Sequence, residues 1–399
     1  MRFSVLYLDM NSFFASVEQH LDPSIRNRPV AITATEGEHG ACVAASYEAK
    51  AYGVKTGTRV RDAKALCPGI VFLPSRHRLY VRYNLKVAEV LDRHAELYRI
   101  RSVDEFQIAL SGEATELPGL TRLVTDMKAA VAREIGPCLR FSAGAGPNHL
   151  LAKIAGKLEK PDGFRWLDRE NMPQAIAHLA LDDLPGISSG MSERLNRAGI
   201  RDMAALCALD PRHARRIWNS VEGERFVRAL QCEDIPLTET RSGGIGQSKI
   251  LAPDFRAPRE AYLVSRWLIA KAGRRLREAG KVAARFGLSI RMIDGRQFSR
   301  SMKCEARQDD LHFLRINRAL WRLAWPDVAR AQILSVGIQL DDTAPLSARN
   351  GDLLSGLGPA ERLPAERAAR AMDLINARFG DGTIRTGVNR PHPGFFERG

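Results

Sequence analysis

The sequence lacks long hydrophobic runs, paired cysteines and clustered histidines. No stretch approaches the roughly 18 consecutive apolar residues of a membrane helix, and the chain passes from Met1 and Arg2 directly into a predicted strand rather than a signal peptide. Its six cysteines are scattered without a C-x-x-C pair, and its nine histidines show no ligand-like spacing. These absences argue against a membrane helix, a disulfide framework and a zinc site. We therefore expect a cytoplasmic protein with reduced thiols and no membrane partner.

Acidic residues are also scarce relative to basic ones. The chain has 46 Asp and Glu against 60 Lys and Arg, a formal net charge of +14. Basic residues greatly outnumber acidic ones between residues 255 and 300. Lys and Arg neutralise phosphates and release counterions, so this balance is typical of nucleic-acid-binding proteins. A merely basic soluble protein or a membrane-surface binder would have the same net charge, and charge alone does not separate these possibilities.

Acidic residues stand at the ends of two predicted strands. The apolar run 3–8 ends at Asp9, and later in the chain Asp104 and Glu105 precede the alternating apolar segment 106–110. Three carboxylates gathered at strand ends are what two divalent cations need to hold a nucleotide triphosphate. An isolated Asp-Glu pair is more often a solvated turn. Adjacent residues of a regular strand also face opposite sides, so both could reach a metal only if the chain bends there.

The length of 399 residues and the periodicity predict several domains. Residues 1–165 alternate strands and helices as an α/β unit, and residues 166–240 are predicted to be helical. The turn containing Gly186, Ile187 and Ser188 resembles a helix-hairpin-helix, whose backbone amides would point at a DNA phosphate. An ordinary helical hairpin with a Pro-Gly turn is the alternative reading.

Residues 241–343 predict a β-α-β-β-α-β module. The pattern indicates four strands and two helices, with strands at 245–251, 283–293, 297–304 and 331–340 and helices at 258–280 and 309–325. In the second strand apolar residues share one face, while Arg285 and Arg291 share the other, where they could bind DNA phosphates. The alternative is that the arginine-bearing face is simply exposed to solvent and binds no DNA. The last segment, 344–399, contains one predicted helix, around 365–379, and has no function that its pattern reveals.

The order of motifs resembles the Y-family translesion DNA polymerases, the class of bacterial polymerases IV and V. The motifs that carry this resemblance are Tyr7–Phe14, Tyr47–Lys55, Ser102–Glu105, Asn148–Gly163 and Leu184–Ile187. The resemblance implies a right-hand polymerase of mixed α/β and α+β domains. It places a palm and fingers in 1–165 (fingers near 19–77), a helical thumb with a helix-hairpin-helix in 166–240 and a DNA-binding little finger in 241–343. Residues 344–399 would be a C-terminal extension.

The resemblance also implies a catalytic centre with two Mg²⁺ ions. Asp9, Asp104 and Glu105 would be the metal ligands, together with the backbone carbonyl of Met10. One ion would lower the pKa of the primer 3′-hydroxyl, and the other would hold the triphosphate and neutralise the departing pyrophosphate.

Further residues of the motifs imply contacts with the incoming nucleotide. Phe14 matches the family's steric gate beneath the sugar, and its neighbour Phe13 could instead be a core residue. The family usually has arginine where Lys50 stands, and lysine loses the bidentate fork. The triphosphate contacts would be Tyr47, Lys50 and Lys160, and the small residues over the base pair would be Ala41, Val43 and Ala44.

Several residues depart from the family pattern. Asn11 stands where the polymerase IV branch has a second aspartate, Phe106 replaces a small residue after the acidic pair, and Ser188 replaces a glycine of the hairpin turn. We find no clear sliding-clamp peptide, and the segment 371–383 resembles the polymerase V branch, so the branch stays open.

The sequence thus predicts an error-prone translesion DNA polymerase that acts as a monomer on primer–template DNA and dNTPs. A sliding clamp or other damage-response proteins are candidate partners. The alternative is a catalytically weak or inactive family member that serves as a DNA-binding accessory protein. A repair nuclease or glycosylase with a helix-hairpin-helix is a second rival.

Overall fold

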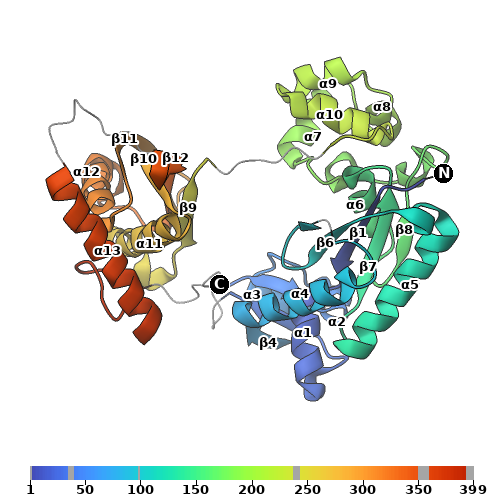
Figure 1. The fold of residues 1–399 in the computed structure, drawn as a ribbon, viewed down its shortest axis with the longest axis horizontal. Coiled ribbons are helices and arrows are strands. Elements are labelled where there is room, and N and C mark those ends of the chain that lie inside the picture. Colours follow the sequence, from blue (N-terminus) through green and yellow to red (C-terminus); the bar gives the residue numbers. More distant parts are fainter. Residues whose placement is uncertain (1, 35–39, 98, 237–242, 349–358, 392–399) are drawn as a thin grey trace. The chain divides into compact units, whose positions relative to one another are not determined.

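The computed structural model describes residues 2–34, 40–97, 99–236, 243–348 and 359–391, and they fall into two compact units. Among the described residues, those up to 236 form the first unit and those from 243 to 391 form the second. Figure 1 shows both units as ribbons. The predicted boundary at residue 240 lies outside the described residues. None of the helices in the described ranges is long and apolar enough to cross a membrane.

The first unit is built on a five-stranded sheet with strand order β5-β6-β1-β7-β8. Two of these strands, β1 and β6, position the acidic residues. The strands are β1 (Val5–Met10), β5 (Arg99–Ile100), β6 (Glu105–Ala109), β7 (Phe141–Gly146) and β8 (Phe164–Trp166). The helices of this part are α1 (Phe13–Leu21), α4 (His77–Asp92), α5 (Leu117–Glu134) and α6 (His149–Leu158).

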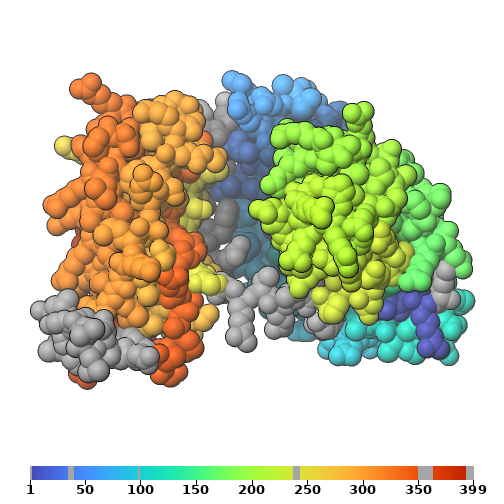
Figure 2. Space-filling model, turned by 90° about the horizontal axis from the view of Figure 1, so that it is seen from above, coloured from blue at the N-terminus to red at the C-terminus, as the bar shows by residue number. Residues whose placement is uncertain are grey.

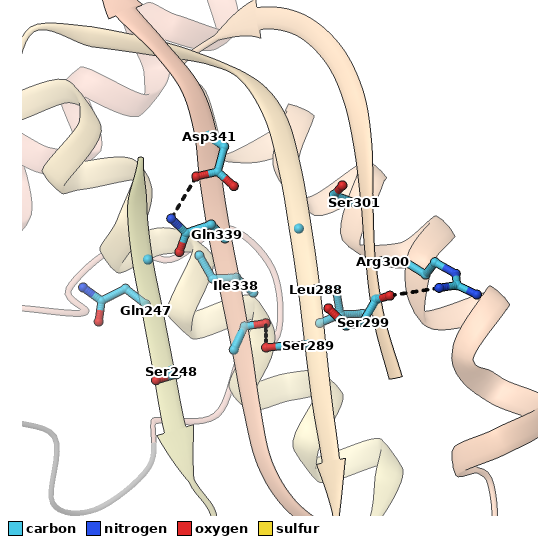
Figure 3. Close-up of a pocket in the computed structure, with 13 residues that line it drawn as sticks. Gln247, Ser248, Leu288, Ser289, Ser299, Arg300, Ser301, Ile338, Gln339 and Asp341 are labelled. Carbon is cyan, nitrogen blue, oxygen red and sulfur yellow. Dashed lines mark hydrogen bonds between the residues drawn. The ribbon is translucent and has the colours of Figure 1, made fainter. Parts of the chain in front are cut away.

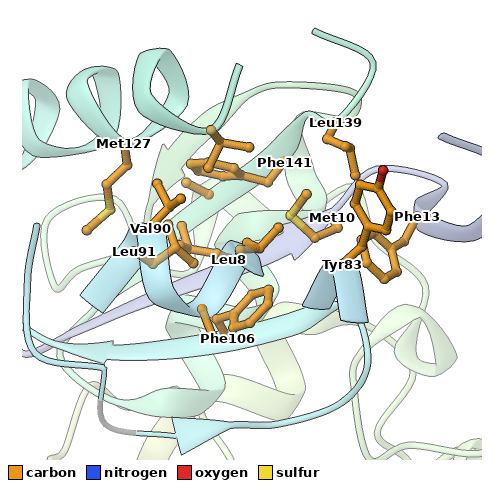
Figure 4. Close-up of a cluster of buried hydrophobic side chains, with 14 of the residues drawn as sticks. Leu8, Met10, Phe13, Tyr83, Val90, Leu91, Phe106, Met127, Leu139 and Phe141 are labelled. Carbon is orange, nitrogen blue, oxygen red and sulfur yellow. The ribbon is translucent and has the colours of Figure 1, made fainter. Parts of the chain in front are cut away.

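Apolar and polar side chains near the end of β1 alternate, so one face of the strand lies in the hydrophobic core and the other is polar. Leu8 and Met10 enter the core, where they meet Phe106 of β6, Phe141 of β7 and Met127 of α5 (Figure 4). The side chains between them along β1 point to the opposite face of the sheet. The core therefore fixes which face of β1 carries the acidic residue at its end.

Helix α6 covers the other face of the sheet at very short range. A Cβ atom on Gly144 of β7 would lie 2.0 Å from the backbone nitrogen of Gly156 and 2.2 Å from the carbonyl oxygen of Ala152. Only glycine allows the helix to approach this closely. The residues of α6 that face the sheet are thereby brought over β1.

A small three-stranded sheet and two short helices form a separate layer within the first unit. Its strand order is β3-β2-β4, with a core of small apolar residues around Ala31, Ala49 and Ala63. The elements are β2 (Val30–Thr33), β3 (Cys42–Ala45), β4 (Val71–Pro74), α2 (Tyr47–Ala51) and α3 (Val60–Leu66).

The segment after β8 is helical, as predicted, and packs around its own apolar cluster. Side chains of Ser188, Asp202 and Asp210 accept hydrogen bonds from backbone amides in the first turns of three of its helices, which explains where they begin. The space-filling view shows this helical segment in yellow-green as one rounded body (Figure 2). Its helices are α7 (Ser189–Arg197), α8 (Met203–Cys207), α9 (Pro211–Trp218) and α10 (Val221–Leu230).

The second unit confirms the predicted β-α-β-β-α-β plan. Its antiparallel sheet has the order β11-β10-β12-β9, and two helices pack on one face through Phe286, Leu288 and Ile290 of β10. The other face is open. The elements are β9 (Ile245–Ile250), α11 (Pro258–Glu278), β10 (Lys281–Met292), β11 (Gln297–Arg307), α12 (Asp310–Val328) and β12 (Ile333–Pro345).

A C-terminal helix, α13 (Pro359–Phe379), is joined to α11 by ion pairs. The guanidinium of Arg277, whose side chain is 4% exposed, bonds to Asp373 at 2.5 and 2.9 Å and to Asp310 at 2.7 Å. Beyond the helix, Arg266 donates to the carbonyl oxygens of Thr386 and Val388. The described part of this extension is thus bonded to the second unit.

Short 3-10 turns complete the elements of both units. They occupy Pro23–Ile25, Gly112–Thr115, Gln174–Ile176, Leu181–Asp183, Pro253–Phe255 and Leu346–Ala348.

Candidate active site

The three predicted metal ligands lie at the adjoining ends of β1 and β6. Asp9 stands directly opposite Glu105 in the antiparallel ladder, a position in which side chains of paired strands are close neighbours. Asp104 precedes the strand, in a bend at 102–104. Its carbonyl oxygen accepts a hydrogen bond from the Met10 amide at 2.8 Å. The bend that two adjacent ligands require is therefore present.

Helix α4 supports this bend. The side chain of Asn84, which is buried, donates to the carbonyl oxygen of Val103 at 2.9 Å. Burial, with further contributions from the Asp9 and Glu105 carboxylates, raises the pKa of Asp104. The carboxylates of Asp9 and Glu105 thus both repel that of Asp104.

The unusual Phe106 does not enter the acidic site. It pairs with Leu8 across the ladder and is fully buried in the core on the opposite face from its neighbour Glu105 (Figure 4). Its bulk is taken up by core packing rather than by the metal site.

Each acidic side chain has a hydrogen-bonding partner. The ammonium of Lys160 lies 2.6 Å from Asp9 Oδ1, and that of Lys153 lies 2.8 Å from Glu105 Oε1. The Ser102 hydroxyl donates to Asp104 Oδ1. Burial is the largest single influence on Glu105 and raises its pKa, but hydrogen bonds from Lys153, Tyr7 and Ser102, together with the charge of Lys153, outweigh it, so the pKa is lowered overall.

The donor set suits a hard divalent cation. Asp9, Asp104 and Glu105 offer only oxygen ligands, which Mg²⁺ prefers. As the side chains stand, no three His, Cys, Asp or Glu groups among the described residues are arranged to hold a metal. The carboxylates instead bond to ammonium and hydroxyl groups. The chemistry of the site fits Mg²⁺, and at Asp9 the cation would have to replace Lys160.

Two predicted nucleotide contacts adjoin Asp9 and Lys160. The ammonium of Lys50 lies 4.3 Å from the centre of the Tyr47 ring and 2.8 Å from the Ser12 hydroxyl. Burial and then Asp9 raise the pKa of Tyr47 to about 12. Partial burial of its ammonium and then Lys160 lower the pKa of Lys50. Tyr47, Lys50 and Lys160 are therefore brought together with Asp9.

The adjacent rings Phe13 and Phe14 lie in different environments. Phe13 is 3% exposed within the core, whereas Phe14 is only half-buried and stacks on Tyr80 with ring centres 4.2 Å apart and planes 14° apart. The Tyr80 hydroxyl donates to Glu18 at 2.7 Å, and Arg76 also bonds to Glu18. Of the two predicted contacts, Phe14 has the accessible ring and Phe13 has a core position.

The predicted small residues over the base pair are on or beside strand β3. Val43 and Ala44 are half-buried within the strand, and Ala41 forms an isolated bridge with Arg59 just before it. All three present little bulk.

Asn11 is a structural residue that the sequence pattern presented only as a departure. It is 4% exposed, its amide nitrogen donates to the Ser142 hydroxyl at 3.1 Å, and its oxygen accepts from the Asp162 amide at 2.8 Å. These bonds tie the loop after Lys160 to the central sheet. The partners are far away in sequence, so no local signal identifies them.

A neutral aromatic pair lies beneath Glu105. The rings of Tyr7 and His149 meet edge to face with centres 5.2 Å apart. Burial and then Glu105 raise the pKa of Tyr7 well above its usual range. Burial, followed by Arg101 and Lys153, lowers the pKa of His149 to about 4. Both side chains are therefore uncharged near neutral pH.

Lys153 and this pair were not singled out from the sequence. Lys153 and Lys157 are four residues apart, a spacing that places them on one face of α6. That helical spacing, within the motif that also contains Lys160, was the signal that could have found Lys153.

The predicted phosphate-binding turn is formed, but one of its amides is already used. Gly186 has a positive φ of 98°, and Ser188 caps α7 through the Met191 amide at 3.3 Å. The amide of Ile187 donates to the Leu184 carbonyl oxygen at 3.1 Å, and its side chain is buried in the apolar cluster. Ile187 therefore contributes to the turn's packing.

The open sheet face of the second unit forms a shallow groove of about 470 Å³ (Figure 3). Small residues, including Gly287, Ser289 and Gly337, line its floor. Both predicted arginines are on this side of β10, but Arg285 bonds to Asp342 at 3.0 Å and Arg291 is exposed.

Comparisons with known proteins cover nearly the whole chain. A family model described as the impB/mucB/samB family matches residues 8–157, and a model of that family's C-terminal domain matches residues 243–353. DNA polymerase IV of Moorella thermoacetica is 31% identical over 393 residues, which is 97% of this chain and 96% of that protein. DNA polymerase IV of Pelotomaculum thermopropionicum is 30% identical over 407 residues, covering 100% and 98%.

Solved structures share the fold. A Y-family DNA polymerase chimera of Dbh and Dpo4 aligns with a TM-score of 0.73 at 21% identity, over 86% of this chain and 99% of that one. An insertion ternary complex of Dbh DNA polymerase aligns with a TM-score of 0.55 over the same shares.

Proposed function

Because the chain belongs to the impB/mucB/samB family of Y-family DNA polymerases, we propose that it is an error-prone translesion DNA polymerase. It extends a primer on a template by nucleotidyl transfer from a dNTP. The observation that carries this proposal is the placement of Asp9 opposite Glu105, with Tyr47, Lys50 and Lys160 beside Asp9. Carboxylate oxygens that can bind cations thus lie next to hydrogen-bond donors that can bind a triphosphate.

Asp9, Asp104, Glu105 and the Met10 carbonyl would hold two Mg²⁺ ions. Bound there, such ions supply the Lewis acidity that activates a primer hydroxyl and neutralises a departing pyrophosphate. The chain's own contribution is to hold these oxygens at two paired strand ends. Burial and then the Asp9 and Glu105 carboxylates raise the pKa of Asp104, and the charge repulsion in this set would be relieved by a bound divalent cation.

The cationic and phenolic groups bind the triphosphate. Lys160 leaves Asp9 and, with Lys50, bonds to phosphate oxygens. The raised pKa of Tyr47, about 12, keeps its phenol protonated at neutral pH, so it serves as a hydrogen-bond donor. Phe14 lies under the sugar and excludes a ribose 2′-hydroxyl, which would lose its hydrogen bonds against the ring.

The remaining segments hold primer–template DNA. We assign the palm and fingers to 1–165, the thumb to 166–240 and the little finger to 241–343. The turn at Gly186 and the open face with Arg285 and Arg291 bind phosphates without reading bases. The small side chains of Ala41, Val43 and Ala44 leave room for a damaged template base. We further propose a cytoplasmic monomer that a sliding clamp or another damage-response protein recruits.

A primer-extension gel tests this function. The parent protein should extend a labelled primer on undamaged and damaged templates only when dNTPs and Mg²⁺ are both present. Asp104→Ala should lower extension by at least about 100-fold, because a metal-binding group supplies several kcal/mol and each 1.4 kcal/mol is tenfold in rate. Fluorescence anisotropy should show nearly unchanged DNA binding by this variant.

The outcomes separate the rival functions. A parent that binds DNA but never extends the primer would be the inactive accessory protein. Release of fragments or bases without dNTPs would indicate a nuclease or glycosylase. Extension by Asp104→Ala at the parent's rate would refute the metal-ligand assignment.

A further inference from the structure

Lys153 contacts Glu105 from the helix that covers the polar face of the sheet. Its ammonium lies 2.8 Å from Glu105 Oε1, and the two side chains are 23% and 19% exposed. Close packing of α6 at Gly144 and Gly156 fixes the height of this helix above the sheet. The ion pair is therefore set by the backbone packing of two rigid elements.

The ammonium of Lys153 also contacts the aromatic ring of Tyr7. It lies 5.1 Å from the centre of the Tyr7 ring, a cation–π contact. Tyr7 is 1% exposed and is itself packed against His149. Lys153 thus has few alternative positions, unlike a lysine on an open surface.

The contact uses one carboxylate oxygen of Glu105. Oε1 accepts the bond from Lys153, and the Tyr7 and Ser102 side chains also act on this carboxylate by hydrogen bonding. Glutamate has three side-chain torsions, so an unheld carboxylate would sample many orientations. A fixed donor at one oxygen selects the orientation of the second.

We propose that Lys153 is a positioning residue that holds Glu105 by Oε1 so that Oε2 faces the metal site. This inference rests on the proposed function, because it takes Glu105 as a metal ligand. Partners that orient metal ligands typically change metal affinity or activity by about 10–100-fold when they are removed.

A positioning role and a purely electrostatic role predict opposite effects on metal affinity when Lys153 is replaced. A lysine near a cation site repels the cation, so loss of its charge alone would tighten metal binding. Lys157 lies one turn further along α6, is exposed, and has Lys153 and Lys160 as charged neighbours. Lys157→Met removes the same charge and is therefore the matched control.

The experiment measures Mn²⁺ binding to the full chain without nucleotide, from the electron paramagnetic resonance signal of free Mn²⁺. Lys153→Met should weaken binding about 10–100-fold. Lys153→Arg should recover most of the affinity, because a guanidinium can donate to the same oxygen. Lys157→Met should leave affinity unchanged or slightly higher. Thermal unfolding of each variant in EDTA reports whether it is folded.

A second readout uses primer extension. The Mg²⁺ concentration for half-maximal rate should rise with Lys153→Met, while KM for dNTP at saturating Mg²⁺ should stay within about threefold of the parent value, because the triphosphate contacts are untouched. A purely structural defect would not be corrected by added Mg²⁺.

The outcomes distinguish failure of this inference from failure of the proposed function. If Lys153→Met binds Mn²⁺ as tightly as the parent or more tightly, the positioning role is overturned. It is also overturned if the substitution lowers DNA affinity alone. If Glu105→Gln leaves Mn²⁺ affinity unchanged, the metal assignment itself is wrong, whatever Lys153→Met does.

Discussion

Two neighbouring residues, Phe13 and Phe14, show how sharply single side chains differ in environment. Both begin α1, but one enters the core and the other stacks on Tyr80 with its ring partly open. The motif named both as candidate nucleotide contacts, with Phe14 as the steric gate and Phe13 as the one that could instead belong to the core. The structure gives Phe13 that core position.

Substitution of each phenylalanine should therefore have a different result. We expect Phe14→Ala to raise incorporation of ribonucleotides relative to deoxyribonucleotides at least about tenfold, because the surface that excludes the 2′-hydroxyl is lost. Phe13→Ala should instead cost about 3–5 kcal/mol of unfolding free energy through the cavity it leaves. Single-nucleotide insertion kinetics and urea denaturation measure the two effects. Exchange of these two phenotypes would contradict the assignment.

Asp104 provides a prediction about pH. Its folded-state pKa is raised, first by burial, so ionisation of this carboxyl destabilises the fold. The unfavourable contribution grows as the pH rises from the ordinary aspartate pKa of about 3.9 to the raised value, and it is complete above that. We expect Asp104→Asn to raise the Tm of the metal-free protein by a few degrees near neutral pH and to have little effect below about pH 3.9.

The matched control is Asp126→Asn, because Asp126 is exposed on α5. Its Tm should equal the parent's at both pH values, since isolated surface substitutions usually have small effects. A lower Tm for Asp104→Asn near neutral pH would contradict the idea that its carboxylate is destabilised. Differential scanning calorimetry in EDTA makes the measurement.

The positions of the candidate site residues were predictable from the sequence where a local motif contains them. Asp9, Asp104 and Glu105 stand in such motifs, and their strand-end positions follow from the apolar pattern. The partners of these residues were not predictable, because Lys153 is 48 residues from Glu105 and Asn11 is 151 residues from Asp162. Only the folded sheet and α6 bring them together.

Among the elements, strand β10 was the one whose buried face the sequence pattern predicted most clearly. Its alternation of Phe286, Leu288 and Ile290 with polar residues correctly gave the buried face. The C-terminal helix was also expected, but it begins at Pro359, earlier than the predicted start near 365. Its contacts with α11 had no sequence signal, because Arg277 and Asp373 are 96 residues apart.

Arg277 should be essential for the stability of the second unit. Removal of its charge leaves the buried Asp310 without its partner and also frees Asp373, whose side chain is 25% exposed. Loss of one partner from a buried ion pair typically costs about 3–5 kcal/mol. We expect Arg277→Met to lower the unfolding free energy by this amount in urea denaturation.

Arg274 supplies the control for this substitution. It also pairs with the extension, through Asp381, but both side chains are more exposed, at 29% and 41%. Exposed pairs contribute about 0–1 kcal/mol, so Arg274→Met should have a small effect. Equal losses from both substitutions would contradict a special role for the buried pair.

At the scale of the whole molecule, each compact unit has its own hydrophobic core. The sequence predicted this division through the change from an α/β pattern to the β-α-β-β-α-β pattern. It also predicted more subdivisions, and within the first unit the helical segment shares an apolar cluster with α6 through Leu151 and Ile154. That shared packing is invisible in a one-dimensional pattern.

Residues 243–391 expressed alone should therefore fold cooperatively. We expect this fragment to bind duplex DNA with an affinity that falls steeply as salt increases, because basic side chains release counterions. It should extend no primer, since the acidic site lies in the first unit. Circular dichroism, anisotropy at several salt concentrations and a primer-extension gel test the three expectations. A fragment that remains unfolded would show that the second unit requires the first.

Under the proposed role of Phe14, its stacking partner Tyr80 extends the control of sugar choice beyond the residues that would contact the nucleotide. Tyr80 is anchored by Glu18, and Glu18 by Arg76, whose side chain is 52% exposed. Arg76→Ala would remove a bond that holds Glu18, and Glu18 in turn anchors Tyr80. We expect the Tyr80 ring, and with it the stacked Phe14 ring, to become free to shift. Tolerance for RNA precursors would then depend on a solvent-facing arginine outside the proposed set of nucleotide contacts, which makes it a site for tuning by evolution or by design.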